Sequence, residues 1–203
     1  GGAGGGAPHR ARGLAGARRH QVRNHSARGG AGGGAGHSHR HDPRHGARGG
    51  GKTDAALGDF ALHAAEFKER AKGLLVRRTR VALEPTIARA RQIYRPAGAV
   101  WNDRRSAFTW PTGANISFRH LDNDADADLY QGHAYSRVYV EELTQFPHPG
   151  PVDKLKATLR SATGAFCGFR ATCNPGGPGH NWVKARYIDS GATTPITETF
   201  VNP

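Results

Sequence analysis

GARGGGKT, residues 46–53, satisfies G-x-x-x-x-G-K-[ST], the pattern of a phosphate-binding loop. In such a loop, glycines let backbone N–H groups surround a phosphate, and the helix that follows directs its positive N-terminus at the same anion. The lysine reaches the outer phosphates, and the hydroxyl of the last residue binds Mg²⁺. The pattern therefore predicts a site for a phosphate group and Mg²⁺, with Thr53 as a metal ligand. The residues predicted to form it are Gly46, Arg48, Gly49, Gly50, Gly51, Lys52 and Thr53.

Two features of the surrounding sequence weaken this interpretation when the loop is taken alone. Glycine occupies 16 of the first 50 positions, so the spacing can arise by chance. A phosphate loop also normally follows a buried hydrophobic strand, and residues 37–45 (HSHRHDPRH) have no such pattern. The strand expected before Gly46 is therefore missing from the sequence pattern, which puts folding and nucleotide affinity in question.

Residues 1–45 form a low-complexity segment of Gly, Ala, Arg and His. The first 50 residues hold nine arginines and one acid, Asp42, and so supply +8 of the formal net charge of +13. With so few large aliphatic residues the segment cannot bury enough apolar surface to offset its chain entropy, and we predict that it is disordered. Its arginines could contact DNA phosphates, or it could be a plain solvated tail. A metal site at its histidines is a weaker interpretation, because no scaffold holds them: His37, His39, His41 and His45.

From about Thr53 the chain alternates between helical and strand-like segments. This alternation is typical of an α/β domain whose mostly parallel sheet is flanked by helices, and we assign residues 46–203 to one such domain. Pro85 is placed in the first turn of its helix, where the missing N–H costs nothing. The expected helices are 53–72, 84–95, 152–162 and 181–189, and the expected strands are 74–81, 108–110 and 115–121 (a hairpin or edge pair), 137–140 and 165–173.

Several classes of protein are disfavoured by composition. No run of 18 apolar residues exists and no signal peptide begins the chain, so we expect no membrane association. Cys167 and Cys173 lack CxxC spacing, which argues against a zinc site or a disulfide framework and favours a reducing, intracellular setting. Methionine is absent even at position 1, so the chain is expected to be a piece of a longer product.

A short apolar strand, residues 137–140 (RVYV), ends in Glu141 and Glu142. Two acids at a strand end, downstream of a phosphate loop, match the second motif of ATPases. There the first acid holds Mg²⁺ and the second polarises the attacking water as general base. We assign Glu141 to the metal and Glu142 to the base, although two solvated acids at a strand end would look the same.

Asn174 follows the next expected strand and begins the rigid turn Asn-Pro-Gly-Gly. Its amide could hydrogen-bond the attacking water or the γ-phosphate and so report hydrolysis to the rest of the domain. We therefore count Asn174 with Lys52 and Glu142 as the catalytic candidates. The alternative is that Asn-Pro-Gly-Gly is simply favourable turn chemistry.

Taken together, these phrases resemble the ATPase domain of phage terminase large subunits. The resemblance covers about residues 46–190 and is strongest in VYVEELTQFP (138–147) and NPGGPGHNWVK (174–184). It implies a RecA-like P-loop NTPase that binds ATP and Mg²⁺, with residues 46–53 on the phosphates, Glu141 and Glu142 as the acidic pair and 172–174 as the coupling segment. It also implies an arginine that acts on a neighbouring subunit, for which Arg77, Arg78 and Arg137 are candidates.

The resemblance further implies how such a protein works. Family members form a homo-oligomeric ring at the portal protein, act with a terminase small subunit, and use ATP to drive double-stranded DNA into a procapsid in the cytoplasm of a bacterial host. They carry a C-terminal nuclease domain, which we expect beyond this chain. The alternatives are another P-loop NTPase, such as a helicase-like motor, and an inactive prophage remnant or basic nucleic-acid-binding peptide.

Overall fold

The computed structural model describes residues 19–21, 51–189 and 197–199. Residues 46–50 and the four histidines considered for a metal site, His37, His39, His41 and His45, lie outside this part of the chain. The helices are α1 Lys52–Phe67, α2 Arg80–Tyr94, α3 Asp124–Asp128, α4 Gly150–Ala157 and α5 His180–Tyr187, with the 3-10 turns η1 Lys68–Arg70 and η2 Leu143–Gln145. The strands are β1 Arg19–Gln21, β2 Lys72–Arg77, β3 Val100–Asn102, β4 Ala107–Thr109, β5 Asn115–His120, β6 Arg137–Val140, β7 Gly168–Ala171 and β8 Thr197–Thr199.

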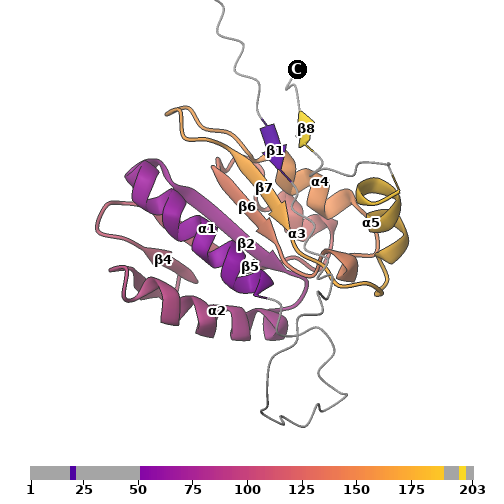
Figure 1. The fold of residues 1–203 in the computed structure, drawn as a ribbon, viewed down its shortest axis with the longest axis horizontal. Coiled ribbons are helices and arrows are strands. Elements are labelled where there is room, and N and C mark those ends of the chain that lie inside the picture. The colour runs from indigo at the N-terminus through magenta and orange to yellow at the C-terminus, as the bar shows by residue number, and fades with distance from the viewer. Residues whose placement is uncertain (1–18, 22–50, 190–196, 200–203) are drawn as a thin grey trace, which may run out of the picture.

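Six strands form one sheet in the order β3-β4-β5-β2-β6-β7 (Figure 1). β2 pairs in parallel with β5 on one side and β6 on the other, and β6 pairs in parallel with β7. β3 and β4 extend the sheet with antiparallel pairs, and β1 pairs separately with β8. The predicted fold, an α/β domain with a mostly parallel sheet flanked by helices, is confirmed.

One face of the sheet packs against α1 and α2. Apolar residues recur along α1, and Leu57 and Phe60 are fully buried against Leu75 of β2 and Ile116 of β5. Tyr94, at the end of α2, is also buried and donates its hydroxyl hydrogen to the carbonyl of Leu57 at 3.1 Å. The two helices are thereby fixed to each other and to the sheet.

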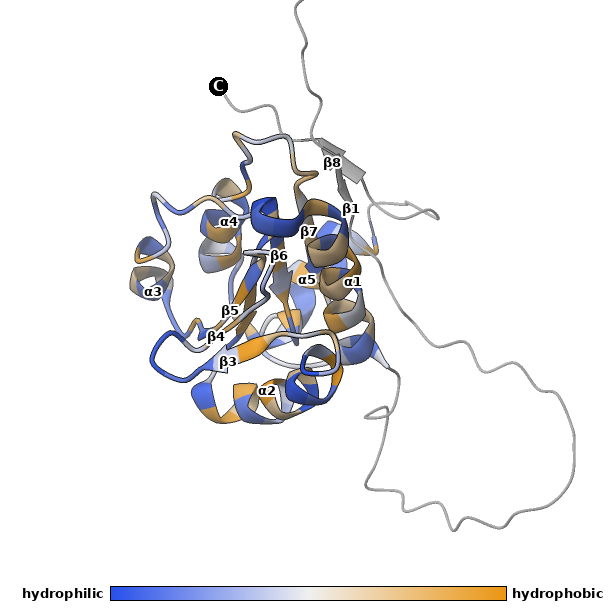
Figure 2. Cartoon of the chain, turned by 90° about the vertical axis from the view of Figure 1, so that its left-hand side faces the viewer, coloured by the Kyte–Doolittle hydropathy of each residue, from blue (hydrophilic) through white to orange (hydrophobic). Residues whose placement is uncertain are grey.

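The opposite face packs against α3, α4 and α5, and in Figure 2 the strands lie between α1 on one side and α3 and α4 on the other. Leu74 and Val76 point to this face while Leu75 points to the other, as the alternation of a strand requires. Because β2 and β6 are covered on both faces, they have continuous apolar runs rather than alternating patterns.

The predicted elements are all present, with shifted ends. The pair predicted at 108–110 and 115–121 is the antiparallel pair of β4 and β5. The position given to Pro85 was wrong: α2 begins at Arg80, with the Thr79 hydroxyl accepting from the N–H of Ala82, so Pro85 lies inside the helix. The missing N–H there removes one hydrogen bond to Val81, which is 76% exposed.

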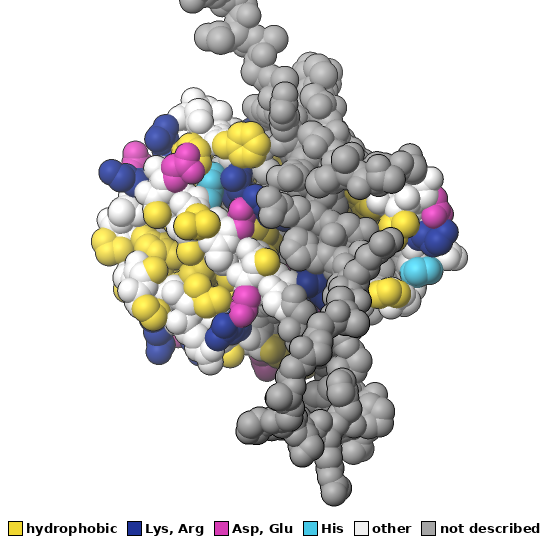
Figure 3. All heavy atoms as spheres, viewed as in Figure 1, with side chains coloured by type: hydrophobic (Ala, Val, Ile, Leu, Met, Phe, Trp, Pro, Cys, Tyr) yellow, Lys and Arg dark blue, Asp and Glu magenta, His cyan; other side chains and the backbone are white. Residues whose placement is uncertain are grey.

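Hydrophobic side chains are exposed on the outer side of α1. Leu62 is 75% exposed, and Ala55 and Ala65 are exposed as well. Figure 3, in the same view as Figure 1, shows hydrophobic side chains gathered over this helix. None of the helices in the described part of the chain has the length and apolar character that crossing a bilayer requires.

Candidate functional site

A cleft of about 650 Å³ opens where the parallel strands β2, β6 and β7 end, between the N-terminus of α1 and the side of α2. We call it the Lys52 cleft. The carboxyl ends of parallel strands are where ligands of α/β proteins bind. Its walls are Gly51, Lys52, Thr53, Asp54, Arg77, Ala82, Pro85, Thr86, Arg89, Glu141, Glu142, Thr172, Cys173 and Asn174.

The end of the phosphate-loop motif forms the start of α1. Gly51 is its N-terminal cap, with φ +63°, and a Cβ built there would meet no atom within 4 Å. Lys52 is the first residue of the helix, and its Nζ donates to Oδ1 of Asn174 at 2.8 Å. Lys52 and Thr53 therefore lie at the positive end of a 16-residue helix, which favours an anion.

The two glutamates differ in burial and in partners. Glu141 is 1% exposed; its Oε2 accepts from the Thr86 hydroxyl at 2.8 Å and lies 3.2 Å from Nε of Arg77. Its Oε1 is buried and has no hydrogen-bond partner within the described residues. An orphaned, buried carboxylate oxygen is costly unless a donor or a cation completes it.

Glu142 faces the open side of the cleft. Its side chain is 41% exposed, and Oε1 lies 2.9 Å from Nη2 of Arg77. Its backbone is left-handed, with φ +55° and ψ +49°, a conformation that costs a residue with a Cβ about 1–2 kcal/mol. Backbone strain of this kind is concentrated at functional sites.

The three arginine candidates occupy different environments. Arg77 points into the cleft of its own chain and pairs with both glutamates. Arg137 is 7% exposed and holds Asp59 and the carbonyl of Phe166, so its guanidinium is enclosed within the domain. Arg78 is more exposed and lies 3.4 Å from Asp122. Arg78 also donates to the carbonyl of Gln145, and its side chain is the most exposed of the three.

The loop 174–179 packs against the turn that follows Glu142. Asn174 accepts at its carbonyl from the Thr144 hydroxyl at 2.9 Å, and the N–H of Gly179 donates to the carbonyl of Thr144 at 2.8 Å. A Cβ on Gly179 would lie 2.0 Å from the carbonyl oxygen of Phe146, so glycine is required there. The two motifs that the sequence separates by about 30 residues therefore form one unit.

Residues 45–163, more than half of the chain, match the family described as the N-terminal part of the T4likevirus-type terminase large subunit. The chain belongs to the terminase large subunit family. No curated protein matches it.

Solved large terminases share the fold. The large terminase of a thermophilic bacteriophage, in one crystal form, gives a TM-score of 0.51 at 17% identity over 68% of this chain and 35% of that one. The same large terminase in complex with ADP gives a TM-score of 0.52 at 15% identity, over 69% of this chain and 35% of that one. The HK97 bacteriophage large terminase gives a TM-score of 0.51 at 12% identity, over 70% of this chain and 31% of that one. This chain thus spans about a third of the length of these terminases and shares the fold of that part.

In this member of the terminase family, α2 contributes residues that the sequence did not single out. Thr86 holds Glu141, as described above. Arg89 forms two hydrogen bonds of 2.7 Å to the carboxylate of Asp54 and thereby joins α2 to α1 at the mouth of the cleft. The hydrogen bond from Arg89 lowers the pKa of Asp54. A threonine and an arginine on a helix form no spacing motif, so the sequence carried no usable signal for them.

Asp59 of α1 is the centre of a second cluster that the sequence did not predict. Its carboxylate accepts from the Tyr139 hydroxyl at 2.6 Å and from Arg170 at 2.7 and 2.6 Å, and Arg137 lies 3.5 Å away. Burial, with Asp59 adding to it, raises the pKa of Tyr139 well above its usual value. This one carboxylate joins the helix that carries Lys52 to β6 and β7, the strands that carry the glutamates and Asn174.

Proposed function

We propose that the chain is the ATP-hydrolysing motor domain of a DNA-packaging terminase, which couples ATP hydrolysis to the movement of double-stranded DNA into a procapsid. The observation that supports this most is the shared cleft: Lys52, Thr53, Glu141, Glu142 and Asn174 come from separate segments and line one space. Family membership supplies the packaging role. The large terminase of the thermophilic bacteriophage has been solved in complex with ADP, which supports a nucleotide as the ligand here.

The residues present fit ATP with Mg²⁺. The described part of the chain holds no group of three or more His, Cys, Asp or Glu side chains that could bind a metal ion unaided. Mg²⁺ suits such a site, because it keeps several waters and binds through one or two protein oxygens together with substrate phosphates. Thr53 and the orphaned Oε1 of Glu141 are the protein oxygens we assign to it. When bound, the metal neutralises charge on the phosphates.

Hydrolysis needs a base next to the γ-phosphate, and we assign Glu142 to this role. Its exposed carboxylate at the end of β6 is well placed to accept a proton from water. Lys52 neutralises phosphate charge, and Asn174 orients the water or senses the γ-phosphate. In the structure Arg77 pairs with Glu142, and this pair has to loosen before the carboxylate can accept a proton.

The lysine and asparagine contact also supports coupling. Phosphates compete with the side-chain amide of Asn174 for Lys52, so nucleotide binding would release that amide, while the backbone carbonyl of Asn174 stays bonded to the Thr144 hydroxyl in the turn after Glu142. Movement of loop 174–179 would follow the state of the nucleotide. Assembly into a ring, contact with the portal protein and the small subunit, a host-cytoplasm location and an arginine that acts between subunits belong to the same proposal.

ATP turnover by the purified chain tests the proposal. Lys52→Ala and Glu142→Gln are each expected to lower kcat by at least about 100-fold, the usual scale for removing a charge-stabilising or general-base group. Lys184→Ala and Glu66→Gln are matched controls, since both residues are exposed and distant from the cleft. Turnover by Lys52→Ala at the parent rate would show that the cleft is not the ATPase site. Nucleotide binding without turnover in the parent would indicate an inactive relative.

A further inference from the structure

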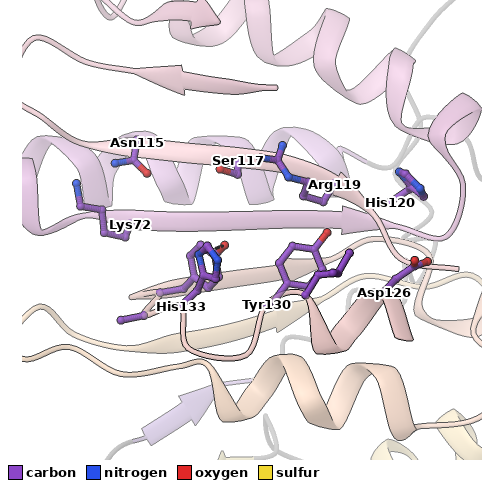
Figure 4. Close-up of a pocket in the computed structure, with 11 residues that line it drawn as sticks. Lys72, Asn115, Ser117, Arg119, His120, Asp126, Tyr130 and His133 are labelled. Atoms are coloured by element: carbon purple, nitrogen blue, oxygen red, sulfur yellow. Dashed lines mark hydrogen bonds between the residues drawn. The ribbon is translucent and has the colours of Figure 1, made fainter. Parts of the chain in front are cut away.

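A second cleft lies on the sheet face opposite α1, along the whole length of β5. We call it the β5 groove. It has a volume of about 530 Å³, a floor formed by β2 and β5, and one wall formed by α3 and the loop that leads to β6 (Figure 4). Its lining residues are Lys72, Asn115, Ser117, Arg119, His120, Asp126, Leu129, Tyr130, His133, Ala134 and Tyr135.

The groove exists because β5 has unlike faces. Ile116 and Phe118 are buried against α2 and its neighbours, whereas Asn115, Ser117 and Arg119 alternate with them and point the other way. The helices of that side cover β2, β6 and β7, but polar side chains occupy the stretch over β5. A sheet face built from an amide, a hydroxyl and a guanidinium is suited to a polar ligand.

Two cations of the groove lack carboxylate partners. Within the described residues, no carboxylate lies within ion-pair distance of Lys72 or Arg119; Lys72 donates to the carbonyl of Gly113, and Arg119 donates to the carbonyls of Ser106 and Phe118. Both side chains are half-buried, so their positive charge is only partly solvated. An anion in the groove would relieve that cost.

The positions of the two cations indicate an extended anion rather than a single small one. Lys72 is paired in register with Asn115, and Arg119 lies four residues further along β5. At about 3.3 Å per residue they are roughly 13 Å apart, which is more than one phosphate can span. A chain with repeating negative charges can contact both.

The segment around α3, which forms the wall, is acidic, but Asp122 lies 3.4 Å from Arg78 and Asp128 lies 2.7 Å from Lys154. Asp126 is the carboxylate that lines the groove itself. Its Oδ2 accepts from the N–H groups of Asp122 and Asn123, so the carboxylate caps α3. Arg119 donates to the carbonyl of Ser106 in the exposed turn before β4. That turn also carries Asp103, Arg104 and Arg105, so it adds a net positive charge beside the groove. An acidic peptide lacks the regular spacing of phosphates, so charge complementarity favours a nucleic acid backbone.

We propose that the β5 groove binds the phosphodiester backbone of duplex DNA, with Lys72 and Arg119 as the main phosphate contacts. The inference rests on the proposed function for its choice of duplex DNA. Asn115 and Ser117 supply further donors, and contacts of this kind position DNA without reading its sequence. The groove and the Lys52 cleft lie at different places in the domain, so the two sites can be altered separately.

Duplex binding of the full chain, measured between about 50 and 200 mM salt, tests the groove. Each phosphate contact contributes about 0.9 to the slope of log Kobs against log salt, so Lys72→Gln with Arg119→Gln should reduce the slope by about 1.8. The matched control is Arg95→Gln with Lys184→Gln, which removes the same charge from exposed sites outside the groove. This control should keep the parent slope.

Equal slopes in the two double variants would overturn the proposal. The proposal would also be overturned if the groove variant lost binding to single-stranded DNA or to polyglutamate but bound duplex DNA as the parent does. Either result would identify a different occupant of the groove. The melting temperature and ATP turnover of the groove variant should match the parent, which excludes unfolding. Lys52→Ala separates the two proposals. If it abolishes ATP turnover and leaves the salt slope of duplex binding unchanged, the groove proposal stands independently of the ATPase. If the groove variant keeps the control's slope while Lys52→Ala still abolishes turnover, only the groove proposal is wrong.

Discussion

Nζ of Lys52 and Oδ1 of Asn174 lie 2.8 Å apart, although 122 positions separate the two residues in the chain. The contact joins the start of α1 to the segment after β7, so the two sides of the cleft are tied to each other. Several consequences for function and stability can be measured.

Asn174→Ala should lower kcat for ATP by about 10- to 100-fold, in line with the loss of one hydrogen-bonding group at a reacting phosphate. KM should change less, because Lys52 and the loop still hold the phosphates. Steady-state kinetics checks both constants. Asn181→Ala, at an exposed position of α5, is the control. An effect confined to KM would show that Asn174 assists binding rather than the chemical step.

Thr86→Val should lower the free energy of unfolding by about 1–3 kcal/mol, because the buried Oε2 of Glu141 loses its hydroxyl donor. The Mg²⁺ concentration needed for half-maximal ATP turnover should rise as well, since Glu141 is then less firmly held. Thr86→Ser keeps the hydroxyl and should resemble the parent in both measurements. Equal behaviour of the valine and serine variants would remove Thr86 from the site.

His63 predicts a pH dependence of stability. Burial, together with Arg137, lowers its pKa from 6.5 to about 4. The unfolded chain therefore binds a proton that the folded chain rejects, and stability falls as pH drops from about 6.5 towards about 4. Over this pH range we expect the free energy of unfolding to fall by on the order of 2 kcal/mol. This is less than the full pKa shift implies, because solvent screens part of the interaction.

Urea unfolding at several pH values between those limits measures this loss. His63→Gln can still hydrogen-bond Ser136, which lies 2.8 Å from Nε2 of His63, and should flatten the dependence. A variant with the parent's slope would show that carboxylates elsewhere cause the acid sensitivity.

Two glycines should respond to alanine with opposite signs. Gly179→Ala places a Cβ against the backbone of Phe146 and should destabilise the fold by about 2–3 kcal/mol. Gly58 lies within α1 and has open space around it, so Gly58→Ala should stabilise by about 0.5–1 kcal/mol. Thermal unfolding distinguishes the two, and a neutral Gly179→Ala would mean that loop 174–179 can move away without cost.

Sequence patterns identified the strands well because apolar runs reflect burial on both sides, as in β2 and β6. They misplaced the start of α2 because Pro85 resembles a first-turn proline, whereas the Thr79 cap actually begins the helix. Motif spacing selected Lys52, Glu141, Glu142 and Asn174, and the structure brings these four together.

The supporting residues could not be found in the same way. Thr86, Arg89 and Asp59 bond to residues that are 35 to 111 positions away in the chain. These residues support the site only because α1 and α2 pack onto the sheet in a particular way. A single sequence has no recognisable pattern that shows which residues this packing brings together. The roles of Gly46, Arg48, Gly49 and Gly50 stay predictions, since these residues lie outside the described part of the chain.

The position of Asp59 determines which parts of the cleft are held together. One carboxylate fastens α1 to β6 and β7, so the lysine, the glutamates and the asparagine share a stiff block. The opposite wall, α2, meets that block at the mouth through Arg89 and Asp54, whose side chains are about half exposed. Tyr94 also holds α2 to the carbonyl of Leu57 in α1, so adjustment around a ligand is left to the exposed side chains at the mouth rather than to either helix.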